Sequence, residues 1–347
     1  MINFALSKLC VMRKILLTSL IVFGFVSSAF SQEEKEFSYI PQVGGTLRAK
    51  YEYQTDVKNS RFQVRDARVG VKGWLAPFLD YKAEINLSEK GKIRTHDLYT
   101  RFHIGEEFKV TAGQFRVPIS VDAARSPHSR LFANRSFIAK QVGNVFDIGV
   151  KGSYQSKKIP FGAEFGIYNG MDYSLSDEVW LRHFLYVGRL NYNYKGLNIV
   201  AAAMTNKPDL YRINMYEGCI SYTFDRFFFE GEFVYKDYLK TTTSSVYSYN
   251  IMGMYCLPIK SKYMNKLMFM GRFDAMTDNS DGFSDESGNL IIDDSARKRV
   301  SVGTTLAYHQ KVKAELRLNY EHYFYEDGVE IGPSDHSKLV AEVMFYF

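Results

Sequence analysis

The sequence lacks any run of 18 or more consecutive apolar residues beyond its first 31 positions. A helix needs about 20 such residues to cross the hydrocarbon layer of a membrane, so helical spans are excluded there. Cysteine is scarce: Cys10 lies in the leading segment, and Cys219 and Cys256 fall in predicted strands. Their spacing supports neither a disulfide framework nor a metal site. We therefore expect no metal and no cofactor.

A strong net charge is missing as well. The formal charge is +6, and it falls to +3 when Lys8, Arg13 and Lys14 are removed with the leading segment. This excess is too small to predict a nucleic-acid partner. None of the seven histidines stands in a recognisable catalytic motif, and the G-x-S-x-G nucleophile motif does not occur. The sequence therefore predicts that the protein is not an enzyme.

The first 31 residues have the organisation of a secretory signal peptide. Met12-Arg13-Lys14 is a short basic region, Ile15 to Val26 is an apolar run of 12 residues, and small residues follow at Ala29 and Ser31. This pattern predicts cleavage before Gln32. Met12 is a better start than Met1, because it puts the basic pair at the front. The apolar run is too short for the alternative, a membrane anchor.

Aromatic residues, by contrast, are abundant, with 25 Tyr and 27 Phe beside only 2 Trp. They occur within runs in which apolar and polar residues alternate, the period of a β-strand. From 312 to 321, one face carries Val, Ala, Leu, Leu and Tyr, and the other carries Lys, Glu, Arg, Asn and Glu. A soluble β-sandwich also alternates. The long strands, the aromatic apolar face and the alternation of short and long connectors favour a transmembrane barrel.

Counting these runs predicts an all-β fold, a transmembrane antiparallel β-barrel of about 16 strands with an inward-folded third loop. Residues 32–42 form a short periplasmic segment, and residues 43–347 form the barrel. The predicted strands cover residues 43–53, 61–73, 79–89, 93–104, 108–117, 142–153, 161–170, 182–194, 197–206, 211–224, 227–238, 246–257, 266–276, 298–309, 312–325 and 336–347. An even count puts both termini on the periplasmic side. Between residues 61 and 73 the alternation slips by one residue at Arg65-Asp66, which a β-bulge would explain.

Between Arg61 and Gly152 the sequence resembles the phosphate-selective porin O/P family. The resemblance rests on motifs that occur in order: RDARVGVKG from 65 to 73, YKAE from 81 to 84, GQFRVP from 113 to 118, SRLF from 129 to 132, NRS from 134 to 136 and DIGV from 147 to 150. It implies a 16-stranded, trimeric porin whose third loop folds into the pore. The connector from Thr205 to Arg212 departs from the family pattern, because it holds only Lys207 and Arg212 where family members have a lysine cluster.

The predicted site residues are basic and lie in or near the long connector from Pro118 to Gln141, which contains one acid, Asp122. Patches of Arg and Lys favour anions, and Arg donates paired hydrogen bonds to phosphate and carboxylate. These candidates could contact solute or could hold the loop against acidic wall residues such as Glu84 and Asp97. The candidates are Arg116, Arg125, Arg130, Arg135 and Lys140 on the connector or beside it, and Arg68, Lys72 and Arg101 on the wall.

We therefore predict a water-filled channel of the Gram-negative outer membrane for passive diffusion of small hydrophilic solutes, with a preference for anions such as phosphate. Expected partners are membrane lipids, lipopolysaccharide and two further copies in a homotrimer. The final Phe347 resembles the signal that barrel-assembly machinery reads in porins. A selective phosphate or pyrophosphate channel and a plugged adhesive barrel are the alternatives. The acidic connector from Thr277 to Arg297 does not fit a calcium-binding loop.

Overall fold

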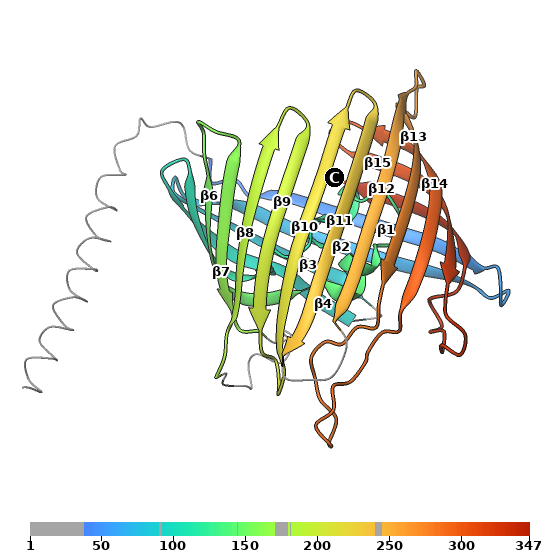
Figure 1. The fold of residues 1–347 in the computed structure, drawn as a ribbon. Coiled ribbons are helices and arrows are strands. Elements are labelled where there is room, and N and C mark those ends of the chain that lie inside the picture. The colour runs from blue at the N-terminus through green and yellow to red at the C-terminus, as the bar shows by residue number, and fades with distance from the viewer. Residues whose placement is uncertain (1–37, 90–91, 144, 171–179, 181, 240–244) are drawn as a thin grey trace, which may run out of the picture.

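The computed structural model describes residues 38–89, 92–143, 145–170, 180, 182–239 and 245–347. Sixteen antiparallel strands follow one another around a closed barrel, in which β16 pairs with β1 (Figure 1). The strands are β1 (Gln42–Gln54), β2 (Ser60–Ala76), β3 (Leu79–Glu89), β4 (Lys92–Ile104), β5 (Phe108–Arg116), β6 (Phe146–Gln155), β7 (Phe161–Tyr168), β8 (Leu185–Tyr194), β9 (Leu197–Asn206), β10 (Arg212–Phe224), β11 (Phe227–Leu239), β12 (Val246–Pro258), β13 (Lys266–Met276), β14 (Arg297–His309), β15 (Lys313–Phe324) and β16 (Lys338–Tyr346). The predicted count is confirmed.

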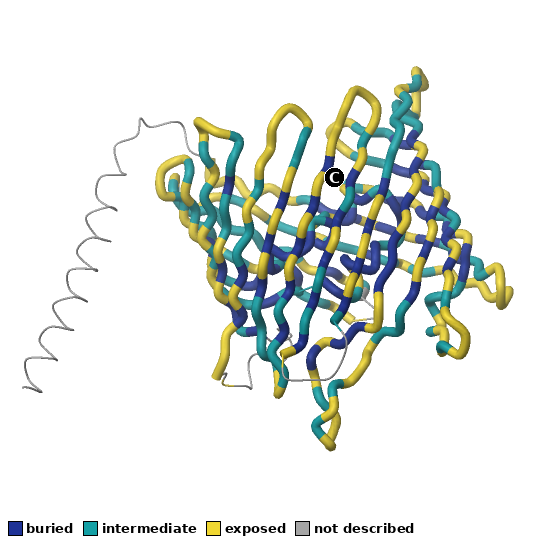
Figure 2. The backbone as a smooth tube through the Cα atoms, viewed as in Figure 1, coloured by how far each residue is buried: buried dark blue, intermediate teal, exposed yellow. Residues whose placement is uncertain are grey.

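Alternation along the strands separates a lipid-facing surface from an inner wall. In β15, Glu315, Arg317 and Glu321 are buried, whereas Leu316 and Leu318 between them are exposed. Figure 2 shows the same exchange of buried and exposed residues along most of the strands. Because successive side chains point to opposite faces, the polar residues lie inside and the apolar ones outside. Burial of the polar face identifies it as the interior of the barrel.

The longest connectors lie at one end of the barrel (Figure 1). The turns after β2, β8 and β10 contain two residues each, whereas 20 residues separate β13 from β14. Phe347 extends the last strand: its N–H donates to the Gly45 carbonyl at 3.2 Å, and the Gly45 N–H donates to the Phe347 carbonyl at 3.0 Å. Its ring is 57% exposed on the outer face. The predicted signal peptide, residues 1–31, lies outside the described residues.

The bulge predicted in the second strand is present. Arg48 of β1 pairs with Asp66, but Ala49 pairs with Val64, so Arg65 has no partner across the strand pair. The extra residue keeps Phe62 and Val64 on the outer face while Asp66 faces Arg48 inside. A second, unpredicted irregularity shifts the pairing of β3 with β4, where Ala83 pairs with Leu98 and Ile85 with Thr95. The bulged Arg65 and the residues at the second irregularity, including His96, line the same cleft inside the barrel.

The only helices among the described residues lie in the connector between β5 and β6. They are α2 (Val121–Ala124), the 3₁₀ turn η1 (Pro127–Ser129) and the π turn η2 (Ile138–Val142). No helix in the described part of the chain is both long and apolar enough to cross a membrane. The connector holding these helices, residues 117–145, is called the constriction segment below.

Candidate functional site

The constriction segment is tied to the inner wall through its backbone. The N–H groups of Ser120 and Val121 donate to the Glu217 carboxylate on β10 at 2.9 and 2.8 Å. Those of Val121 and Asp122 donate to the Glu232 carboxylate on β11 at 2.9 and 3.1 Å. The first N–H groups of a helix have no partner within it, so these two wall carboxylates complete the hydrogen bonding of α2.

Arg125 fixes the same end of the segment through its side chain. Its guanidinium donates to both carboxylate oxygens of Glu230 on β11, one at 2.7 Å, and to Asp122 at 3.0 Å. The Glu230 side chain is only 1% exposed. Burial opposes ionisation of Asp122, but Arg125 and the Ser136 hydroxyl favour the carboxylate more strongly and lower its pKa to about 2. Arg125 therefore braces the segment.

The middle of the segment reaches the strands on either side of the barrel closure. The Ala133 N–H donates to Asn319 on β15 at 2.9 Å, and its carbonyl accepts from Arg48 on β1 at 2.5 Å. The Phe137 N–H donates to Asp274 on β13 at 3.0 Å. His128 stacks on Tyr346 of β16, with 3.8 Å between ring centroids. These partners are inner-wall groups, so the segment crosses the interior of the barrel.

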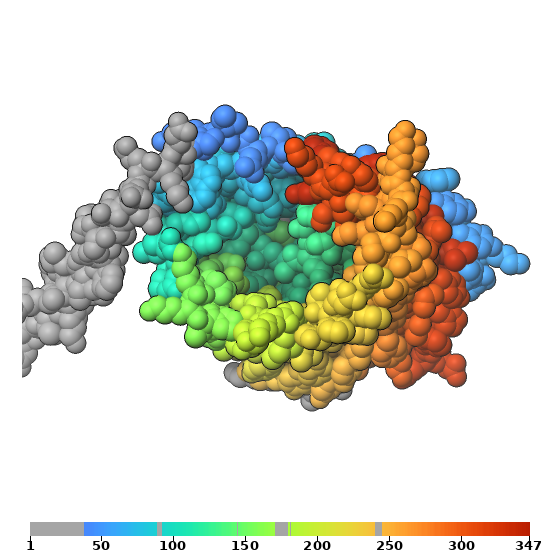
Figure 3. All heavy atoms as spheres, turned by 90° about the horizontal axis from the view of Figure 1, so that it is seen from above, coloured from blue at the N-terminus to red at the C-terminus, as the bar shows by residue number. Residues whose placement is uncertain are grey.

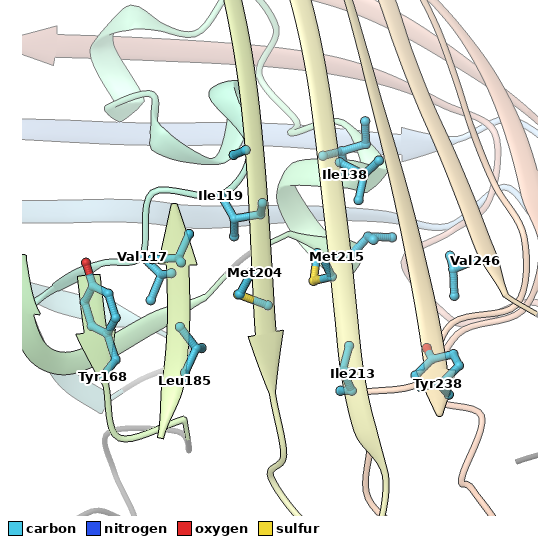
Figure 4. Close-up of a cluster of buried hydrophobic side chains, with 14 of the residues drawn as sticks. Val117, Ile119, Ile138, Tyr168, Leu185, Met204, Ile213, Met215, Tyr238 and Val246 are labelled. Carbon is cyan, nitrogen blue, oxygen red and sulfur yellow. The ribbon is translucent and has the colours of Figure 1, made fainter. Parts of the chain in front are cut away.

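An apolar cluster fixes the remaining part of the segment. Val117, Ile119 and Ile138 pack against inward side chains of β8 to β12, including Met204 and Met215 (Figure 4). All of these residues are almost completely buried inside the barrel. Removing such side chains from water stabilises the contact by about 1.5–3 kcal/mol each. The β8–β12 side of the interior is therefore packed with protein.

A hollow remains at the centre of the barrel. Figure 3 shows it from the end with the short turns, and the green atoms of the chain after β5 extend across part of it. Between the constriction segment and the β2–β6 wall lies a cleft of about 410 Å³. Six basic and two acidic side chains line this cleft, which is called the cationic cleft below. The cations are Arg65, Arg68, Arg94, Arg116, Arg135 and Lys140, and the acids are Asp66 and Asp281.

Pairing inside the protein decides which cleft cations remain for solute. Asp66 is held by Arg48 at 2.8 Å and by Arg68 at 3.1 Å, and Arg68 also binds Glu84 at 3.1 Å. Arg65, in the bulge, makes no hydrogen bond or ion pair with any other described residue. Its guanidinium therefore keeps its donors for water or for an anion.

The electrostatics of the segment itself reflect crowded positive charge. Burial, together with Arg65 and Arg68, lowers the pKa of Arg135 to about 10. Arg130 is 6% exposed and forms no ion pair with the described residues; it donates to the Arg125 carbonyl at 3.0 Å. Burial and the neighbouring Arg135 and Arg48 lower its pKa well below the usual range. Each shift means that the positive form is disfavoured there, which a nearby anion would relieve.

The structure brings half of the predicted site residues together. Arg68, Arg116, Arg135 and Lys140 line the cationic cleft. The other four lie elsewhere. Arg125 is paired with Glu230, and Arg130 is a buried residue of the segment that is not in the cleft lining.

The remaining two wall residues do not line the cleft. Lys72 is exposed, and Arg101 donates to Tyr99 and Thr111. The acids that hold the segment are also different from the two suggested by the sequence. Glu84 and Asp97 bind Lys82 at 3.0 and 2.5 Å, whereas the segment is held by carboxylates on the far wall. The proposed bracing partners were therefore wrong, because the segment crosses the barrel before it makes its contacts.

Sequence reasoning missed Arg65, Arg94 and His96 as cleft residues. A signal for Arg65 was present, because the alternation slips at that residue. A bulged residue is free to turn its side chain away from the regular pattern. The bulge near His96 leaves a similar trace, because Ile93 and Leu98 are both exposed but are five positions apart, so they cannot share one face of an unbroken strand.

The acidic connector between β13 and β14 contributes two residues to the lining of the cleft. Lys236 donates to Asn279 at 3.0 Å and to the Ser280 carbonyl, which also accepts from the Tyr238 hydroxyl at 2.8 Å. This anchoring brings Asp281 and Phe283 into the cleft lining. Within the described residues, no group of three or more His, Cys, Asp or Glu side chains is arranged to hold a metal ion.

Solved structures of outer-membrane channels share this fold at low sequence identity. The anion-selective porin from Comamonas acidovorans matches with a TM-score of 0.63 and 11% identity, over 88% of this chain and 98% of that chain. OmpF of Salmonella typhi, in complex with daunomycin, matches with a TM-score of 0.61 and 9% identity, over 91% of this chain and 100% of that chain. The channel DcaP of Acinetobacter baumannii matches with a TM-score of 0.59 and 12% identity, over 88% of this chain and 97% of that chain. A search of curated protein sequences finds no match.

These likenesses establish the fold. The family is established by sequence, because residues 42–214 match the model of the phosphate-selective porins O and P. The matched region contains β1 to β9, the whole constriction segment and most of the cationic cleft. The chain belongs to the phosphate-selective porin O and P family and is an outer-membrane porin.

Proposed function

We propose that the porin passes small hydrophilic solutes by passive diffusion and prefers anions. The observation that carries this proposal is the lining of the cationic cleft, with six cations and two acids, of which Asp66 is already neutralised by Arg48 and Arg68. A patch of Arg and Lys at a narrow point raises the local anion concentration and repels cations.

The position of the cleft supports the same conclusion. The constriction segment packs on the β8–β12 wall, so open space remains on the β2–β6 side. Solutes that cross the barrel must pass there. The mechanism is size exclusion by the segment together with electrostatic attraction by the arginines.

Planar-bilayer recordings across a KCl gradient test the proposal. The reversal potential should show anion preference, and both Arg65→Gln and Arg135→Gln should move it toward zero. Lys72→Gln is the matched control, because it removes the same charge from an exposed residue outside the cleft. A cation-selective reversal potential for the unmodified porin would overturn the proposal.

A selective phosphate channel is the second candidate. It is favoured by the convergence of Arg65, Arg94, Arg116 and Arg135, since guanidinium groups match the geometry of phosphate. The connector after β9 argues for weaker selectivity, as it carries only Lys207 and Arg212. Phosphate that blocks chloride current at micromolar concentration would favour the selective channel, and block only at tens of millimolar would favour general anion diffusion.

The assembly and the processing of the chain complete the proposal. We infer a homotrimer, for which a trimeric form of OmpT from Vibrio cholerae with the same fold offers a precedent. Light scattering in detergent should give three chains per particle. Amino-terminal sequencing of the protein from outer membranes should begin at Gln32. Deletion of Phe347 should reduce the amount of barrel that is assembled.

A further inference from the structure

The cationic cleft has an apolar side that small inorganic ions do not need. Val145, Phe146, Pro208 and Phe283 line it together with the arginines. Its volume of about 410 Å³ lies within the roughly 300–1,000 Å³ of sites that hold small organic molecules. Apolar walls stabilise apolar parts of a ligand and give no advantage to a hydrated inorganic ion.

The two kinds of lining come from different elements. Arg65, Arg68, Arg94 and Arg116 belong to β2, β4 and β5. The apolar residues come from the end of the constriction segment, the start of β6 and the connectors after β9 and β13. A solute in the cleft therefore meets guanidinium groups and aromatic rings at the same time.

Phe146 also orients one of these guanidinium groups. The Arg116 guanidinium carbon lies 4.3 Å from the centroid of the Phe146 ring. A guanidinium group donates hydrogen bonds in its own plane, so contact with a ring on one face leaves its edge as the donor surface. The pair combines a ring and a cation in one wall of the cleft.

Phe283 is held in place, although it belongs to a long connector. Gly282, with φ +92, packs so closely that an added Cβ atom would lie 2.4 Å from Ile213. Ser280 is completely buried, and its carbonyl accepts from Tyr238. These contacts fix the residues on both sides of Asp281, so Asp281 and Phe283 form a defined part of the cleft.

Asp281 places a negative charge in the same part of the lining. It forms no ion pair with the described residues, and its N–H donates to Asp293 at 2.7 Å. The connector carries further acids nearby, including Asp293 and Asp294. A solute with a second negative charge at this end would be repelled.

We propose that the cleft binds small organic anions with one charged head and an apolar or aromatic body. The inference rests on the anion preference proposed above. The carboxylate or phosphate head contacts Arg65 and Arg135, the body contacts Phe146 and Phe283, and Asp281 discriminates against solutes that are negatively charged at both ends.

The test compares three carboxylates as blockers of chloride current through the reconstituted porin. Benzoate should reach half-block at a concentration on the order of tenfold lower than acetate, because it buries a ring against the aromatic residues. Terephthalate, which has a second carboxylate at the far end of the ring, should block less well than benzoate. Equal block by acetate and benzoate would overturn the inference.

Two variants assign the effect to residues. Phe283→Ala should remove most of the advantage of benzoate and leave block by acetate unchanged, and Asp281→Asn should improve block by terephthalate. Phe229→Ala, on the lipid-facing surface, is the matched control. If benzoate keeps its advantage in Phe283→Ala, the ring does not bind there. A cation-selective reversal potential, by contrast, would reject the anion preference itself.

Discussion

Arg125 provides the sharpest test of how the constriction segment is held. The substitution Arg125→Met keeps an unbranched side chain and removes the guanidinium group with its charge. It leaves the Glu230 carboxylate, 1% exposed, without the guanidinium that contacts both of its oxygens. Breaking a buried ion pair from one side costs about 3–5 kcal/mol, since the remaining charge keeps its desolvation penalty. The free energy of unfolding should fall by that amount. If releasing the constriction segment from the wall costs less than leaving Glu230 unpaired, the segment should detach instead and the fall should be smaller.

The measurement is guanidinium unfolding in detergent micelles, followed by far-ultraviolet circular dichroism. Single-channel recordings of the same variant detect detachment as a larger and noisier conductance. The double variant Arg125→Met with Glu230→Gln should recover most of the loss, because the Glu230 charge is removed together with its partner and Asp122 keeps its hydrogen bond from Ser136. Lys157→Met, which breaks an ion pair with Glu106 whose partners are each 57% exposed, should cost less than about 1 kcal/mol. A loss below about 1 kcal/mol for Arg125→Met, with unchanged conductance, would refute the bracing role.

Three further predictions concern residues in or beside the same segment. Burial lowers the pKa of His128 to about 4, so between pH 6.5 and about 4 the unfolded chain binds a proton that the folded chain does not. The free energy of unfolding therefore falls as the pH is lowered through that window, and His128→Phe should flatten this part of the pH–stability curve. Gly113 has φ +131 and an added Cβ atom would lie 2.3 Å from the Leu98 carbonyl, so Gly113→Ala should lower the melting temperature of the barrel by at least several degrees. Arg130→Met should raise the free energy of unfolding by about 1–3 kcal/mol in guanidinium titrations, because it removes a buried cation that forms no ion pair with the described residues; a loss of stability would show that the charge is compensated.

The strands were predictable because their signal is local. A residue two positions away lies on the same face, so the alternation of β15 can be read without knowing its neighbours. The same rule located the bulge at Arg65, where the alternation slips. Most predicted strand ends agree with the structure within one residue, and the start of β6 differs most, at 146 instead of 142. That difference arises because η2 occupies the apolar residues before it.

The site was only partly predictable because its contacts are distant in sequence. Arg125 and Glu230 are separated by 105 positions, and nothing near Arg125 indicates which wall the segment will meet. The apolar cluster inside the barrel left a weak signal. In β9, the inward Val200, Ala202 and Met204 are apolar like the outward residues beside them, which is unusual for a strand that faces water on one side.

Pairing, rather than the number of inward charges, determines the field that a solute meets. The inner wall carries many acids, which from sequence alone indicate a weak preference for anions. The structure shows that Glu217 and Glu232 accept from backbone N–H groups and Glu230 binds Arg125. These carboxylates hold the segment against one wall and are covered by it. On the opposite wall, Arg65 has no hydrogen-bond or ion-pair partner among the described residues. The acids of the far wall therefore hold the segment, whereas the arginines of the cleft face the solute. An anion preference is therefore compatible with a nearly neutral chain.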